Sequence, residues 1–120
     1  MGTILIVDDS SLIRSVASGA TTEAGHVAVI ATNGQEGLDA MENNEIDMIF
    51  SDVNMPVMGG IEMVRQIKEN PKYKFIPVIM LTTESDPGLK EQGKALGVKA
   101  WMLKPFNKQK FFMAVKKLLR

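Results

Sequence analysis

Ile46-Asp47-Met48-Ile49-Phe50-Ser51-Asp52-Val53-Asn54-Met55-Pro56 is the stretch that indicates the fold. A short apolar run bounded by polar residues is typical of a buried strand. Pro56 and the pair Gly59-Gly60 prevent the strand from continuing past Asp52. In parallel α/β sheets, ligands bind at the edge where the strands end. The sequence therefore predicts a functional carboxylate, Asp52, at the end of a strand.

Three other apolar runs also end at polar side chains. Residues 4–7 lead into Asp8 and Asp9, residues 78–81 lead into Thr82, and residues 100–103 lead into Lys104. If all four runs are neighbouring parallel strands, one edge of the sheet gathers three carboxylates, a hydroxyl and an ammonium group.

Helix signals separate these strands. The first helix follows Ser10 or Ser11, has its apolar positions at Leu12, Ile13, Val16, Ala17 and Ala20, and ends at Gly25. A strand over residues 27–31 and a helix over residues 35–43 come next. Two further helices run from Gly59-Gly60 to Asn70-Pro71 and from Asp86-Pro87 to Gly97. The last begins after Asn107, with Arg120 in its final turn and five residues inward: Phe111, Phe112, Val115, Leu118 and Leu119.

The resulting order, βαβαβαβαβα, predicts the fold class. Strands that alternate with helices indicate an α/β fold with a parallel sheet covered on both faces. At 120 residues, the chain is expected to form one domain over residues 1–120.

Composition excludes several classes of function. The chain has no cysteine, so disulfides and thiol catalysis are excluded. No apolar stretch reaches membrane-spanning length and no signal peptide is recognisable, so we expect a soluble cytoplasmic protein with no membrane partner. The net charge is zero, although residues 1–60 carry −8 and residues 61–120 carry +8. We expect these charges to be ordinary solvated surface, and we expect no nucleic-acid partner.

The predicted edge has a consistent chemistry. Crowded carboxylates repel one another unless a cation neutralises them, and an oxygen-only ligand set favours Mg²⁺. Lys104 and Thr82 add a cation and a hydroxyl donor, which together could hold a phosphoryl group. Asp52 is then a candidate nucleophile, because carboxylates form acyl phosphates. The alternative is that Lys104 only forms an ion pair with Asp52 or Asp9 and no transfer occurs.

The sequence resembles response-regulator receiver domains over residues 3–119, and it is most like the single-domain chemotaxis members of that family. The resemblance rests on four motifs that occur in this order at predicted strand ends. They are Ile4-Leu5-Ile6-Val7-Asp8-Asp9-Ser10, Asp52-Val53-Asn54-Met55-Pro56 with Gly59-Gly60, Leu81-Thr82-Thr83, and Lys104-Pro105-Phe106.

The resemblance implies a role for each site residue. Asp52 is the phosphoacceptor, Thr82 bonds one phosphoryl oxygen, and Lys104 pairs with another, with a cis bond to Pro105. Mg²⁺ is held directly by Asp9, mainly through water by Asp8, and also by Asp52 and the backbone carbonyl of Asn54. Trp101 matches the aromatic position that swings inward on activation, so Thr82 and Trp101 are the implied switch residues. Trp101 could instead be a packed residue of the sheet.

The resemblance also implies a five-stranded flavodoxin-like sheet of order 2-1-3-4-5 and a set of partners. A histidine kinase supplies the phosphoryl group. A separate protein, either a flagellar motor component or a phosphotransferase, docks on the face formed by the fourth helix, last strand and last helix, and a phosphatase is a further partner.

The function implied is a phosphorylation-controlled signalling switch that is not an enzyme in the usual sense, because it catalyses only its own phosphorylation and dephosphorylation. Within the family, the alternative is a phosphorelay intermediate. A Mg²⁺-dependent phosphohydrolase with an aspartate nucleophile is disfavoured, because that class places a second acid two residues after the nucleophile and position 54 is Asn54. A nucleotide or flavin carrier is disfavoured because the chain has no P-loop and no G-x-G-x-x-G motif.

Overall fold

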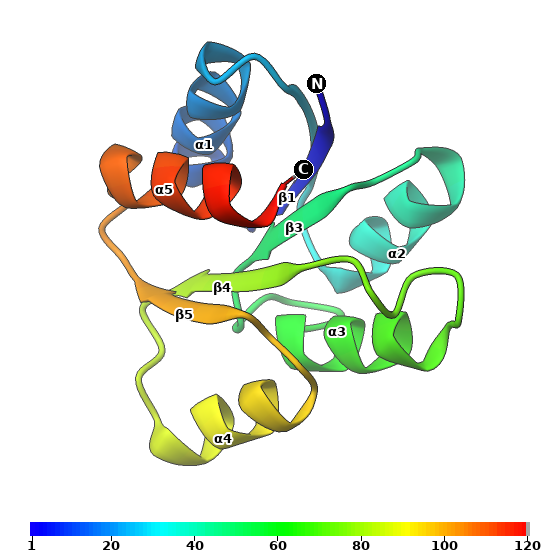
Figure 1. Ribbon diagram of the computed structural model, residues 1–120. Coiled ribbons are helices and arrows are strands. Elements are labelled where there is room, and N and C mark those ends of the chain that lie inside the picture. Colours follow the sequence, from blue (N-terminus) through cyan, green and yellow to red (C-terminus); the bar gives the residue numbers. More distant parts are fainter. Residues whose placement is uncertain (120) are drawn as a thin grey trace.

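The computed structural model describes residues 1–119, and strands and helices alternate throughout (Figure 1). The strands are β1 (Thr3–Val7), β2 (Val27–Ala31), β3 (Met48–Ser51), β4 (Val78–Thr82) and β5 (Ala100–Leu103). The helices are α1 (Ser11–Glu23), α2 (Gly34–Asn43), α3 (Gly60–Glu69), α4 (Pro87–Ala95) and α5 (Lys108–Leu118). The predicted element order is therefore confirmed.

The five strands form one parallel sheet of order β2-β1-β3-β4-β5. Helices α1 and α5 cover one face, and α2, α3 and α4 cover the other (Figure 1). The order reverses between β1 and β3, which is where ligands bind in open sheets of this kind. The predicted α/β, flavodoxin-like fold class is confirmed.

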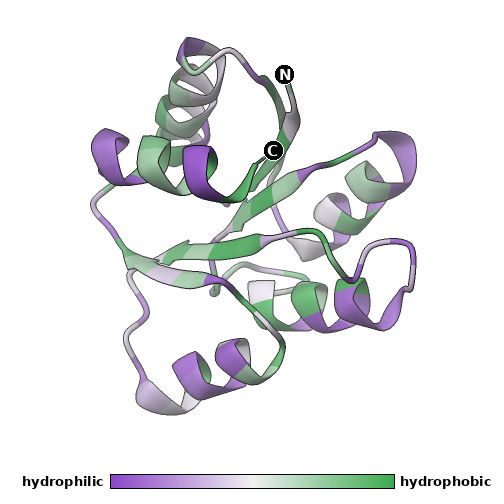
Figure 2. Cartoon of the chain, in the orientation of Figure 1, coloured by the Kyte–Doolittle hydropathy of each residue, from purple (hydrophilic) through white to green (hydrophobic). Residues whose placement is uncertain are grey.

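The core consists of two apolar clusters, one on each face of the sheet. Successive residues of β3 alternate between them: Ile49 packs under α2 and α3, while Met48 and Phe50 pack under α1 and α5. All four residues of β3 are buried, and Figure 2 shows the strands as the most hydrophobic part of the chain. A central strand buried on both faces holds the residue that follows it, Asp52, in a fixed position.

Helix ends follow the sequence signals. The side chains of Ser10, Asn33, Asp86 and Asn107 each accept a hydrogen bond from a backbone N–H in the first turn of the helix that follows. Gly25 and Gly97 end α1 and α4 with φ of +88° and +89°, a conformation that favours glycine.

The apolar positions of α1 do not all face the core. Leu12 and Val16 are 68% and 39% exposed. The buried residues of α1 are instead Ala17, Ala20 and Thr21. The Thr21 hydroxyl donates to the carbonyl of Ala17 at 2.8 Å, which lets a polar residue occupy the inward face. The apolar stripe of α1 is therefore rotated partly toward solvent.

The C-terminal helix follows the prediction more closely. Phe111 and Val115 are buried, and Phe112, Leu118 and Leu119 pack against the same cluster. The predicted place of Arg120 in the last turn lies outside the described residues. No helix within residues 1–119 is long and apolar enough to cross a membrane.

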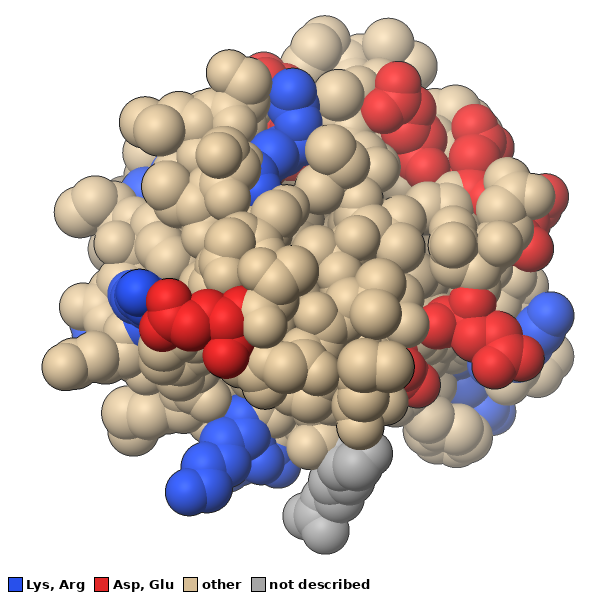
Figure 3. Space-filling model, turned by 90° about the horizontal axis from the view of Figure 1, so that it is seen from above, with Lys and Arg blue, Asp and Glu red and all other residues tan. Residues whose placement is uncertain are grey.

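Opposite charges stay partly separate in the fold. Helix α2 carries Glu36, Asp39 and Glu42 and no basic residue, whereas α5 carries four lysines and no acidic residue. Figure 3, which looks down on the molecule, shows several acidic side chains on the side where α2 lies. Helix α5 is therefore the more basic of these two helices.

Candidate functional site

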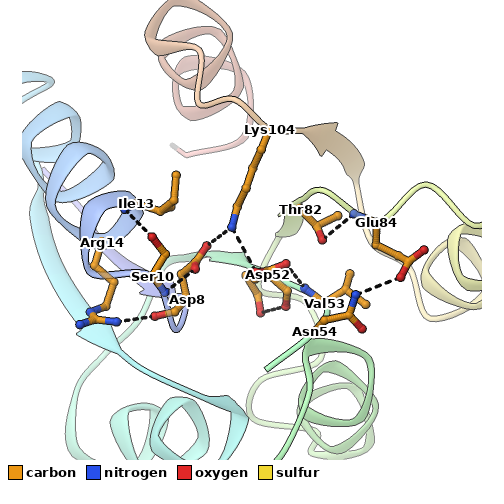
Figure 4. Close-up of polar contacts among 11 residues, drawn as sticks. Asp8, Ser10, Ile13, Arg14, Asp52, Val53, Asn54, Thr82, Glu84 and Lys104 are labelled. Carbon is orange, nitrogen blue, oxygen red and sulfur yellow. Dashed lines mark hydrogen bonds and ion pairs between the residues drawn. The ribbon is translucent and has the colours of Figure 1, made fainter. Parts of the chain in front are cut away.

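Four strands bring polar side chains to one edge of the sheet. Val7 pairs with Ser51 and Thr82 pairs with Leu103 in the parallel register, so Asp8, Asp52 and Lys104 follow directly from paired or neighbouring strands. Figure 4 shows these side chains pointing toward one another at that edge. The predicted meeting of the strand-end residues is confirmed.

Three carboxylates crowd this edge. One oxygen from each of Asp8, Asp9 and Asp52 lies within 4.8 Å of the other two. Asp8 and Asp52 are buried, at 1% and 7% exposure, while Asp9 is exposed. Burial raises the pKa of Asp8, against the opposing effects of the Ser10 N–H and of Lys104. The cluster thus concentrates negative charge in a partly desolvated place, which favours a bound cation.

Lys104 supplies a positive charge to the two buried carboxylates. Its Nζ lies 3.0 Å from Oδ2 of Asp8 and 3.1 Å from Oδ2 of Asp52. Burial alone would lower the pKa of Lys104, but hydrogen bonds to the two carboxylates outweigh it and the net pKa is raised. Of the two pairings that the sequence analysis considered for Lys104, the one with Asp52 is present. The ion pairs of Lys104 are with Asp8 and Asp52, and the exposed Asp9 is not among them. The Lys104–Pro105 bond is cis, as the resemblance implied.

The backbone fixes the two buried carboxylates. The N–H of Ser10 donates to Oδ1 of Asp8 at 2.9 Å, and the N–H of Val53 donates to Oδ1 of Asp52 at 2.7 Å. The Oδ2 atoms of both carboxylates are thereby left to the ammonium group of Lys104. Oδ2 of Asp52 therefore faces the ammonium group of Lys104, which is the positive charge that an incoming anion would meet.

Glu84 links Thr82 and Asn54 to each other, a role that the sequence analysis did not assign. The N–H of Glu84 donates to Oγ1 of Thr82 at 3.0 Å, and its side-chain Oε1 accepts from Nδ2 of Asn54 at 2.9 Å. Both contacts are drawn in Figure 4. Thr82 is fully buried at the end of β4. Nothing in the order of residues signals this role for Glu84, because it depends on how the β4–α4 loop turns.

Arg14 is a second residue that sequence reasoning missed. Its Nη1 donates to the backbone carbonyl of Asp8 at 2.8 Å. Arg14 lies one helical turn after Ser10, the residue that caps α1. That spacing, together with its being the one basic residue in 1–60, is the signal that could have identified it.

Trp101 lies in β5 beside the site rather than in it. The indole Nε1–H donates to the backbone carbonyl of Glu84 at 2.8 Å, and the side chain is half-buried against the cluster under α3 and α4. The prediction that Trp101 is a packed residue of the sheet and the prediction that it belongs to a switch are both compatible with this position.

Comparison with known proteins agrees with this geometry. The family model described as response regulator receiver domain matches residues 4–116. A chemotaxis protein CheY homolog of Campylobacter jejuni is 36% identical over 88% of this chain and 83% of its own length. Chemotaxis protein CheY1 of Helicobacter pylori is 32% identical over 88% of this chain and 87% of its own length.

Solved structures give the same result. The chemotaxis response regulator CheY4 of Vibrio cholerae superposes with a TM-score of 0.92 at 41% identity, covering 99% of both chains. The sheet order, the acidic edge and these similarities agree. The chain therefore belongs to the response regulator receiver domain family, the CheY-like signalling domains of two-component systems.

Proposed function

We propose that this chain is a single receiver domain, spanning residues 1–120, that works as a phosphorylation-controlled switch. Asp52 accepts a phosphoryl group from the phosphohistidine of a histidine kinase, and the phosphorylated domain signals by docking to a separate protein. The observation that carries this proposal is the contact of Lys104 with Asp52 at 3.1 Å, made at the end of a buried strand. A buried carboxylate beside a fixed ammonium group is suited to accept an anionic group.

The transfer needs no reactant beyond the phosphohistidine. A carboxylate oxygen of Asp52 attacks phosphorus, the phosphorus–nitrogen bond breaks, and its electron pair returns to the imidazole. Lys104 then pairs with a phosphoryl oxygen, and the hydroxyl of Thr82 donates to another. The switch resets when water attacks phosphorus, which releases inorganic phosphate and restores the carboxylate of Asp52.

The donor set fits Mg²⁺. Three carboxylates with ligand atoms within 4.8 Å of one another, and no histidine or cysteine among them, suit a hard cation. We propose Asp8, Asp9, Asp52 and the backbone carbonyl of Asn54 as the residues that hold it. When bound, the ion supplies charge that offsets both the carboxylates and the phosphoryl oxygens. Asp9 offers a further carboxylate outside the ion pairs of Lys104.

An exposed apolar stripe on α1, beside the site, is available to bind the kinase. Leu12 and Val16 lie one turn apart on α1 and face solvent. Helix α1 begins at Ser11, two residues after Asp9, so this stripe starts next to the carboxylates. We propose that the phosphohistidine domain packs on this stripe while its imidazole reaches Asp52.

The output surface is proposed on the face formed by α4, β5 and α5. Leu103 and Met113 are 51% and 71% exposed there, which gives the face apolar contact area. Lysines surround it on α4, just before β5 and on α5, namely Lys90, Lys94, Lys99, Lys110 and Lys117. We therefore propose a partner segment that is apolar and acidic.

The biological setting is proposed from the relatives. Two of them are named as chemotaxis proteins, so we propose chemotaxis as the pathway and a flagellar motor component as the docking partner. A phosphotransferase, as in a phosphorelay, is the alternative partner. A phosphatase that shortens the life of the phosphoryl group is a further proposed partner.

Chemical mapping tests the acceptor. The protein is incubated with acetyl phosphate and Mg²⁺, reduced with borohydride, and digested. Borohydride reduces an acyl phosphate to an alcohol, so the expected product is homoserine at position 52. Reduction at Asp8 or Asp9 instead would contradict the assignment of Asp52.

A further inference from the structure

Gly93 is the buried residue of α4, in the interior of a nine-residue helix. Glycine there weakens a helix relative to alanine, so its presence needs a reason. A Cβ atom placed on Gly93 would lie 3.0 Å from Cζ3 and 3.4 Å from Cε3 of Trp101, closer than ordinary contact. The missing side chain of Gly93 therefore makes room for the six-membered ring of the indole.

The other end of the indole is held by a hydrogen bond. Nε1–H of Trp101 donates to the backbone carbonyl of Glu84 at 2.8 Å. Trp101 is thus fixed at both ends, by the open space at Gly93 and by the carbonyl of Glu84. An aromatic ring without an N–H, such as phenylalanine, could not make this bond.

Glu84 connects this arrangement to the acceptor loop. Its N–H donates to the hydroxyl oxygen of Thr82 at 3.0 Å, and its side chain accepts from Asn54 at 2.9 Å (Figure 4). A Thr82 hydroxyl that turns toward a phosphoryl group can no longer accept from the Glu84 N–H in the same geometry. The N–H of Glu84 then needs another acceptor, and the carbonyl of the same residue is the group that holds the indole.

We propose that Gly93 and Glu84 are positioning residues for Trp101, and that the indole is a fixed wedge between β5 and α4. When Asp52 is phosphorylated, the β4–α4 loop, the indole and α4 then move as one unit, and the ring does not rotate alone. The response to phosphorylation rests on the proposed function, whereas the position of the indole between β5 and α4 does not depend on that function.

The wedge shapes the proposed output surface. Trp101 lines a cavity of about 280 Å³ shared with Leu103 and Lys110, and a second of about 390 Å³ shared with Lys90 and Lys94. The ring therefore forms a wall of both. A shift of the indole together with α4 moves this shared wall, while the ring keeps its contact with Gly93.

A double-substitution experiment tests the wedge without phosphorylation. Gly93→Ala is made in the natural chain and in the Trp101→Phe variant, and the folding equilibrium is measured by urea unfolding followed by circular dichroism. Beside Trp101, the added methyl group crowds the ring, and we expect the folding equilibrium constant to fall. Beside the smaller phenylalanine, we expect Gly93→Ala to raise the constant by about fivefold, as alanine does in helices.

The reversal of sign is the decisive result. Gly19→Ala is the matched control, because it lies within α1 and a Cβ there meets nothing within 4 Å. Its effect should be the same in both backgrounds. If Gly93→Ala changes the folding equilibrium constant in the same direction beside Trp101 and beside phenylalanine, Gly93 does not make room for the indole and the proposal fails.

Fluorescence tests the contact between Gly93 and Trp101 directly, since Trp101 is the single tryptophan of the chain. Quenching of its fluorescence by acrylamide measures how accessible the indole is. In folded Gly93→Ala, we expect the quenching constant to rise at least about twofold as the crowded ring is displaced. An unchanged constant would mean that the ring does not depend on Gly93.

The same measurement tests the response to Asp52. Wild-type protein is phosphorylated with acetyl phosphate and Mg²⁺, and the adduct is verified by intact mass. A wedge that moves with α4 keeps its accessibility, so we expect an unchanged quenching constant. A twofold change in either direction would show a ring that rotates on its own and would overturn this part. Failure to form the adduct would instead count against the proposed function and leave the test of the wedge intact.

Discussion

The ammonium nitrogen of Lys104 lies 3.1 Å from Oδ2 of Asp52 and 3.0 Å from Oδ2 of Asp8, so one cation bridges two buried carboxylates. The three residues follow three different strands, β5, β3 and β1. The bridge therefore ties the fold of the sheet to the electrostatics of the site. Changes to it should be visible both in stability and in phosphoryl chemistry.

Removal of the Lys104 charge should destabilise the protein. Lys104→Met keeps most of the side-chain volume but leaves two buried carboxylates without a cation, and we expect a loss of about 2 to 3 kcal/mol in the free energy of unfolding. Urea unfolding with a chelator present measures this loss. The control is Lys108→Met, which breaks the exposed pair with Glu23 and should cost less than about 1 kcal/mol. Equal losses from the two variants would contradict the buried bridge.

Asp8→Asn should stabilise the protein at neutral pH. Burial raises the pKa of Asp8, so the folded state holds a proton on this group more tightly than the unfolded state does. The charged form is therefore unfavourable in the folded protein, and its cost is present above the raised pKa and disappears as the pH falls below the unfolded value. We expect a gain in the free energy of unfolding at pH 7 that shrinks toward acidic pH. Urea unfolding across that range measures it, and a loss of stability at pH 7 would contradict the prediction.

Mg²⁺ should stabilise the folded protein. A ligand that binds only the folded state at ten times its dissociation constant adds about 1.4 kcal/mol to the free energy of unfolding. Thermal unfolding with and without Mg²⁺ measures the shift, and Asp9→Asn should reduce it. The control is Asp39→Asn, which removes an acidic side chain on α2 and should leave the shift intact. A shift that is the same in Asp9→Asn would exclude Asp9 from the proposed metal site.

Two glycines should respond in opposite directions to alanine. Gly97 ends α4 with φ of +89°, so Gly97→Ala is expected to cost about 1 kcal/mol or more in the free energy of unfolding. Gly19 lies inside α1 with open space around it, so Gly19→Ala is expected to gain up to about 1 kcal/mol. Chemical denaturation of both variants checks the pair. Stabilisation by Gly97→Ala would contradict the left-handed conformation of that residue.

The positions of the site residues could be predicted largely because they lie at strand ends. Asp8, Asp52, Thr82 and Lys104 each end an apolar run, and a parallel sheet brings such ends together whatever the details of packing. The caps of the helices, such as Ser10 and Asp86, were also predictable, because capping is a local property of the chain.

The remaining errors and omissions depend on tertiary contacts. In α1 the polar Thr21 is buried while Leu12 is exposed, and no periodicity reveals the hydroxyl–carbonyl bond that satisfies Thr21. The pairing of Lys104 with Asp8 instead of Asp9 depends on which carboxylate turns inward after β1. The presence of Gly93 inside α4 becomes understandable only once the ring of Trp101 is seen against it.

The central claim is tested most directly by the intact mass of the protein after incubation with acetyl phosphate and Mg²⁺. Asp52→Asn and a sample with chelator are run beside the wild type. We predict one labile phosphoryl adduct in the wild type that requires Mg²⁺ and is absent in Asp52→Asn. No adduct in the wild type, or an adduct that persists in Asp52→Asn, would contradict the assignment of Asp52 as the phosphoacceptor.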